Sequence, residues 1–104
     1  DDLPPELPES DPANEETHHV FPILCEERDA LRTTLEEAGI QTGVHYPVPI
    51  HRHLAFENEP FVRGVSHPVS ETTSAKLLSL PIHPKLTSEE VERVVEAIRK
   101  HYAR

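Results

Sequence analysis

The chain has 104 residues, a length that suits one small domain with a modest hydrophobic core. It contains no tryptophan, no methionine and one cysteine, and its formal net charge is −9. Basic residues do not cluster in any part of the sequence, which argues against a nucleic-acid partner. The apolar runs are only a few residues long, so no segment is expected to span a membrane.

The negative charge is concentrated at the start of the chain. Residues 1–16 contain seven acidic residues, no basic residue and four of the eleven prolines. Such a segment buries too little apolar surface to offset its ordering entropy, so residues 1–17 are predicted to form a poorly ordered linker. Nothing in it resembles a signal peptide. The lone Cys25 is expected to be a buried, inert thiol, which fits a reduced cytoplasmic setting.

A strand, a helix and a second strand are expected to follow the linker. Residues 19–24 are predicted to form a short strand, in which Pro22 indicates an edge or a bulge. Apolar residues at helical spacing predict a helix over about residues 27–38. Gly39 is well placed as the left-handed residue that ends this helix. The partly alternating residues 40–46 predict the second strand, which two prolines then end.

The middle of the chain is less regular. Residues 47–66 form a long irregular stretch, and a loop of that length in a small domain is usually functional or mobile. A short helix is predicted over residues 70–77. Residues 78–83 (LSLPIH) predict a third strand with a proline near its end.

The last element is the most clearly predicted. Thr87 and Glu90 are spaced as a capping box, which predicts a helix over residues 88–102. The pair Glu89–Arg93 is expected to form an ion pair on the polar face. An apolar stripe runs along the opposite face. It consists of Val91, Val94, Val95, Ile98 and Tyr102.

This order of elements predicts an α+β fold for residues 18–104. Each helix has one apolar stripe, which it can bury by packing against one face of a sheet. The expected architecture is a small three-stranded sheet with helices packed on one face. The other face would be free to pack against another part of a protein.

The residues that carry chemistry gather after the first helix. His45, Tyr46, His51 and His53 lie in one short, proline-stiffened segment. Three imidazoles could in principle bind zinc, but no cysteine pair and no helical histidine pair accompany them, so substrate-facing histidines are the stronger interpretation. Neutral histidine and tyrosine are suitable hydrogen-bond partners for sugar hydroxyls or phosphate oxygens.

His45 and Tyr46 leave two interpretations open. In a strand, adjacent side chains point to opposite faces, so one would reach a ligand while the other packs. Tyr46 would alternatively be a core or interface aromatic whose hydroxyl finds a partner. The three lysines lie in a weak polar helix, a turn and a surface helix, and none has the setting of a Schiff-base lysine.

Three stretches of the sequence resemble one enzyme family. They are HHVFPI (18–23), RDALRTTLEEAGIQTGVHYPVPIH (28–51) and PVSETTSAKLLSLPIHPKLTSEEVERVVEAI (68–98). The chain from about residue 18 to residue 102 thereby resembles the C-terminal small domain of the pyridoxal-phosphate-dependent nucleotide-sugar aminotransferases of the DegT/DnrJ/StrS type. The spacing within HYPVPIH and the later LSLPIHP carry the likeness. Residues 57–66 match no pattern of the family, so they do not indicate which sugar is used.

The resemblance implies a homodimeric enzyme of the aspartate aminotransferase fold. An N-terminal large domain, absent from this chain, would supply the Schiff-base lysine and hold pyridoxal 5′-phosphate, so this chain alone would be inactive and would bind no cofactor. The family pattern places His45, Tyr46 and His51 near a nucleotide-sugar that receives an amino group from an amino acid, with glutamate as the expected donor. The alternative is a non-catalytic interaction or regulatory module that keeps the same fold.

Overall fold

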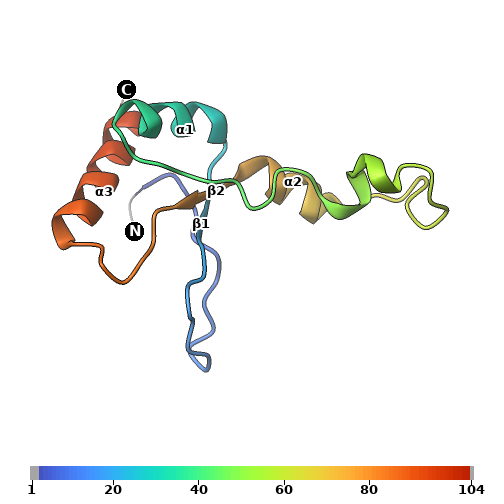
Figure 1. Ribbon diagram of the computed structural model, residues 1–104, viewed down its shortest axis with the longest axis horizontal. Coiled ribbons are helices and arrows are strands. Elements are labelled where there is room, and N and C mark those ends of the chain that lie inside the picture. Colours follow the sequence, from blue (N-terminus) through green and yellow to red (C-terminus); the bar gives the residue numbers. More distant parts are fainter. Residues whose placement is uncertain (1–2, 104) are drawn as a thin grey trace.

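The computed structural model describes residues 3–103 and has an α+β architecture, as the sequence predicts. The elements are β1 (Phe21–Leu24), α1 (Arg28–Glu37), the 3-10 turns η1 (Ile50–Arg52) and η2 (Leu54–Phe56), α2 (Pro68–Lys76), β2 (Leu77–Leu80) and α3 (Ser88–Tyr102). Figure 1 shows α1 and α3 together on one side of the strands, while α2 and the chain before it extend to the other side.

The sheet has two strands within residues 3–103, so the expected three-stranded sheet is wrong. β1 and β2 pair antiparallel, with Pro22 opposite Ser79. Proline is tolerated there because the backbone groups of Ser79 point away from β1, toward Gly43. The expectation that Pro22 marks an edge strand agrees with this pairing.

The predicted strand over residues 40–46 reduces to one bridge. Gly43 donates its N–H to the Ser79 carbonyl at 3.0 Å and accepts the Ser79 N–H at 2.7 Å. The chain then turns away at His45, and Pro47 and Pro49 have no N–H with which to extend a ladder. The alternating pattern of residues 40–46 therefore does not produce a strand, because these residues have no continuous partner strand.

The acidic N-terminal segment makes a similar bridge on the opposite edge. Glu6 and Leu24 exchange two backbone hydrogen bonds of 2.8 Å, and Leu3 packs against the core. Between them and β1 the chain is exposed and turns near Asp11. The division into a linker (1–17) and a domain (18–104) stays a prediction.

Helix α1 ends as the sequence predicts. Gly39 has a φ of 75°, and the N–H groups of Gly39 and Ile40 bond to the carbonyls of Glu36 and Leu35, which is a Schellman motif. Arg93 of α3 donates to the Ala38 carbonyl at 2.7 Å. Arg93 thus satisfies the end of α1 in place of the predicted pair with Glu89.

The core lies between the sheet and the helices α1 and α3. It consists of Ile23, Cys25, Leu31, Leu35, Ile40, Leu78 and Ile98. The capping box of Thr87 and Glu90 is present, and Ile98 is buried as expected, but Val91 is 48% exposed. Val91 lies near the start of α3, before the part of the helix whose residues pack on the core.

Cys25 is buried, as predicted. Its side chain is almost fully covered, and its Sγ lies 3.5 Å from the Lys76 carbonyl oxygen. Burial raises the pKa of this thiol, and Arg28 only partly offsets that effect. A thiol with a raised pKa is less often the reactive thiolate, which fits an inert structural role.

Residues 46–76, which we call the arm, project from this core (Figure 1). The chain measures 50 × 36 × 24 Å and has a radius of gyration of 16.1 Å, against about 13 Å for a compact chain of this length. Arg28 ties the base of the arm to α1, because its Nη1 donates to the carbonyls of Ser74 and Leu77 at 3.0 and 3.1 Å.

Candidate functional site

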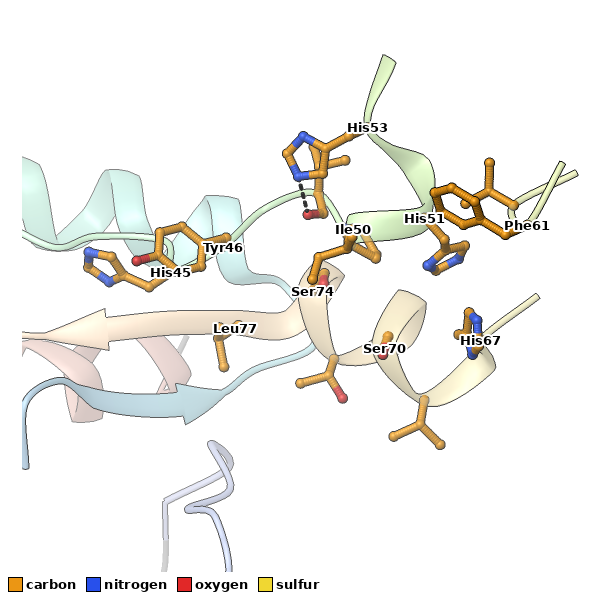
Figure 2. Close-up of a pocket in the computed structure, with 15 residues that line it drawn as sticks. His45, Tyr46, Ile50, His51, His53, Phe61, His67, Ser70, Ser74 and Leu77 are labelled. Carbon is orange, nitrogen blue, oxygen red and sulfur yellow. Dashed lines mark hydrogen bonds between the residues drawn. The ribbon is translucent and has the colours of Figure 1, made fainter. Parts of the chain in front are cut away.

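An open groove of about 800 Å³ lies between the HYPVPIH segment and α2 (Figure 2). Proline at the first position of α2 starts the helix two residues earlier than predicted, because proline is pre-organised for that position. The side of α2 that lines the groove carries Val69, Ser70, Thr73 and Ser74. The labelled lining residues are His45, Tyr46, Ile50, His51, His53, Phe61, His67, Ser70, Ser74 and Leu77.

His45 is fixed at the inner end of the groove. Its Nδ1 lies 2.9 Å from the Ser79 hydroxyl on β2. The ring folds back over Gly43, where a Cβ would lie 2.6 Å from the His45 Cε1. Glycine at position 43 is therefore required for the imidazole to reach Ser79 in this orientation.

Tyr46 is 73% exposed, so it is not a core residue of this chain. Its ring meets the His45 ring edge-on, with centroids 5.5 Å apart. Because no strand forms here, the prediction that His45 and Tyr46 point to opposite sheet faces does not apply. Both side chains line the same groove, which leaves Tyr46 open to a ligand or to an interface.

His51 is held on the facing side of the groove. Its side chain is only 9% exposed, and its Nε2 lies 2.8 Å from Glu71 Oε1 on α2. Arg52 donates to the same oxygen through Nε and Nη2, at 3.2 and 3.0 Å. These bonds, from His51 first and then Arg52, lower the pKa of Glu71 from 4.5 to about 2. Glu71 is therefore a carboxylate at neutral pH.

The imidazoles do not converge on one point. His45 bonds to Ser79, His51 bonds to Glu71, and His53 Nε2 lies 3.1 Å from the Val48 carbonyl oxygen (Figure 2). Within residues 3–103, no three potential ligands are placed to hold a metal ion. The three separate partners give each ring its own orientation in the groove.

The sequence alone did not point to Glu71, Arg52, Ser79 or His67. His67 packs edge-on against His51, with ring centroids 4.7 Å apart. Glu71 is the acidic residue in the first turn of a weakly predicted helix, so nothing local distinguished it from a solvated charge. Its contact with His51 joins residues 20 apart and depends on how the arm folds.

The lysines do not suit a cofactor site in this groove. Lys76 forms an ion pair with Glu26, and Lys100 lies 4.0 Å from Glu96. Lys85 is exposed in the turn that precedes α3. Among residues 3–103, no lysine lines the groove, so these residues do not provide the amine that pyridoxal phosphate requires.

The family assignment rests on a comparison with known proteins. Residues 1–99 match the model of the DegT/DnrJ/EryC1/StrS aminotransferase family. The chain belongs to this family. In the described residues, no helix has the length and apolar character needed to cross a membrane.

Relatives and solved structures agree with this assignment. The dTDP-3-amino-3,6-dideoxy-alpha-D-galactopyranose transaminase of Aneurinibacillus thermoaerophilus is 41% identical over 80% of this chain and 22% of its own length. The erythromycin biosynthesis sensory transduction protein EryC1 of Saccharopolyspora erythraea is 39% identical over 89% of the chain and 25% of its own. DesV from S. venezuelae, crystallised with a ketimine intermediate, has a TM-score of 0.89 and 38% identity, covering 99% of this chain and 28% of DesV.

The chain thus spans about a quarter of the length of the relatives that it matches. Its fold is that of one segment of these larger aminotransferases. The groove described above belongs to that segment.

Proposed function

We propose that this chain is the C-terminal small domain of a pyridoxal-phosphate-dependent aminotransferase that acts on a nucleotide-linked keto-sugar. An amino acid, glutamate in our proposal, donates the amino group. The groove carries this proposal, because it places His45, Tyr46 and His51 of the family-like HYPVPIH segment on one surface. The transaminase name of a relative that is 41% identical supports the same reaction class.

The three side chains suit a ligand rich in hydroxyl and phosphate oxygens. His45 and His51 each use one ring nitrogen for a protein partner, and within residues 3–103 the other nitrogen has no partner and can bind a ligand. Tyr46 offers an exposed hydroxyl beside them. Because Ser79 and Glu71 already orient the two rings, little side-chain entropy is lost when a nucleotide-sugar binds.

We propose that the rest of the enzyme covers the arm. The arm exposes more large apolar side chains than a free surface of its size normally does. They include Tyr46, Val48, Ile50, Leu54, Phe56, Phe61, Val65 and Val69. An N-terminal large domain and a second subunit of a homodimer are the partners that would bury them.

The cofactor would be held by the large domain. Pyridoxal phosphate, when bound there, supplies the electron sink for amino transfer, and the protein supplies binding and orientation. The lysines of this chain lie outside the groove, so the 104-residue chain is expected to be inactive alone. The cytoplasm is the proposed setting, because Cys25 has no second cysteine to pair with.

A second candidate function is a non-catalytic regulatory module with the same fold. One relative, 39% identical, is named a sensory transduction protein. The exposed arm would then bind a regulatory partner in place of a catalytic domain. Amination of a keto-sugar nucleotide by the complete protein, with glutamate as donor, distinguishes the two, because a regulatory module gives no turnover.

The role of the groove is tested with His51→Ala and Tyr46→Phe in the complete protein. Loss of one hydrogen bond to the ligand is expected to lower kcat/KM by roughly 3- to 10-fold. His83→Ala is the matched control, because His83 lies in a turn outside the groove. If both variants melt earlier and keep normal kinetics, the two side chains are structural and the proposed ligand role is wrong.

A further inference from the structure

His51 and Glu71 form a pair that links two separate parts of the arm. Glu71 lies in the first turn of α2, and His51 lies in η1 across the groove. Their 2.8 Å contact joins a nearly buried imidazole to a carboxylate that is about one-third exposed. The pair spans the two walls of the arm and is not a local contact within one helix.

The ionised side chain of Glu71 can only accept hydrogen bonds. The bonds from His51 and Arg52 keep its pKa at about 2, so it carries no proton at neutral pH. A contact of this length with an acceptor requires that His51 Nε2 carries the hydrogen. In neutral His51, Nδ1 is then an acceptor, because an imidazole holds one proton on its two nitrogens.

The surroundings leave that acceptor available. Within residues 3–103, the structure gives His51 Nδ1 no hydrogen-bonding partner. The neighbouring ring of His67 meets His51 edge-on and restricts its rotation (Figure 2). Glu57 and Arg63 line the hollow on the other side of His51.

We propose that Glu71 is a positioning residue that fixes the tautomer and orientation of His51, so that Nδ1 accepts a hydrogen bond from a ligand hydroxyl or amine. Arg52 assists by holding the same carboxylate oxygen. This inference rests on the proposed function, in which His51 contacts the nucleotide-sugar. It adds that ligand recognition at His51 depends on a residue that does not itself touch the ligand.

The first test reads the imidazole directly and needs no activity. Histidine-selective ¹⁵N NMR of the complete protein, under conditions in which the imidazole is neutral, should show His51 with its proton on Nε2. That N–H resonance should be protected from exchange. Glu71→Ala should remove the protection, and Glu96→Gln, a charge change on the exposed face of α3, should preserve it. An averaged tautomer, or a proton on Nδ1, in the unmodified chain overturns the inference.

The second test is a double-mutant cycle in the complete enzyme. Glu71→Ala should lower kcat/KM for the keto-sugar nucleotide by about tenfold when His51 is present. In the His51→Ala background it should have almost no further effect, because the two residues act as one unit. Glu71→Gln keeps the packing, and its amide oxygen still accepts from Nε2, so partial recovery is expected.

The outcomes of the cycle separate the two proposals. If His51→Ala alone changes nothing, the proposed ligand role of His51 fails, and the inference fails with it. If His51→Ala lowers kcat/KM while Glu71→Ala does not, only the positioning role is overturned. Equal and additive losses also overturn it, because they indicate a general structural effect.

Discussion

The His45 ring lies directly over the backbone of Gly43, so close that a Cβ at position 43 would lie 2.6 Å from Cε1. The same two residues join the HYPVPIH segment to β2. Gly43 exchanges two backbone hydrogen bonds with Ser79, and His45 bonds to the Ser79 side chain. One buried serine thus sets both the course of the chain and the direction of the imidazole.

Gly43→Ala is expected to displace His45 and break its bond to Ser79. A buried hydrogen bond and the strain of overpacking together predict a loss of roughly 1–3 kcal/mol in the free energy of unfolding. Urea denaturation measures the loss, and histidine NMR reports the displaced ring.

The matched control is Ser79→Ala, which removes the hydroxyl and leaves room for the ring. It should release His45 without the steric penalty. If Gly43→Ala leaves both the stability and the His45 resonances unchanged, the close approach described here is not present in solution.

The stability that Glu71 contributes should be lost at low pH. Because the folded state lowers the pKa of this carboxyl from 4.5 to about 2, its contribution is complete above about pH 5 and is lost as the pH falls toward 2. Thermal melts of the unmodified chain and Glu71→Gln should differ most at neutral pH. The difference should shrink between pH 5 and pH 2. A difference that stays constant across this range would contradict the assigned contacts.

Arg28 should contribute more to stability than a surface arginine. Arg28→Ala removes two hydrogen bonds to the carbonyls of Ser74 and Leu77, and we expect a loss of about 1–3 kcal/mol. Arg32→Ala, which breaks an exposed pair with Glu36, should cost less than about 0.5 kcal/mol. Urea denaturation of the two variants checks this ranking, and equal losses would show that Arg28 does not hold the base of the arm.

Truncating a buried side chain should cost far more stability than truncating an exposed one. Leu31 is fully buried, so Leu31→Ala is expected to lower the free energy of unfolding by roughly 2–5 kcal/mol. In a domain of this size, such a loss leaves little stability. Val91→Ala should change it by less than about 0.5 kcal/mol, because Val91 is half exposed. A large loss at Val91 would show that another part of the chain covers it.

The helices were predictable because their signals are local. Thr87 and Glu90 lie three residues apart, and Gly39 follows the C-cap residue Ala38 of α1, so the sequence contains the complete start and stop signals. The structure confirms both. Val91 was misassigned because helical spacing shows which residues share a face, and only the fold shows how far along the helix that face is covered.

The failed strand over residues 40–46 and the organisation of the groove depend on distant contacts. Residues 40–46 alternate, but a strand also needs a partner with free backbone groups, and only Gly43 finds one. Arg28 pairs with the adjacent Asp29, yet it also bonds to carbonyls more than 40 residues away. The contact of His51 with Glu71 likewise arises only once α2 lies opposite η1.

The position of α3 determines when this domain can fold during synthesis. Ile98 belongs to the core, and Arg93 satisfies the last turn of α1, yet both lie within the final 15-residue helix. The two strands are also separated by more than 50 residues, so their pairing waits for the arm to be made. While a ribosome synthesises the chain, α1 emerges without its packing partner. We therefore expect the core to close only after α3 has left the exit tunnel.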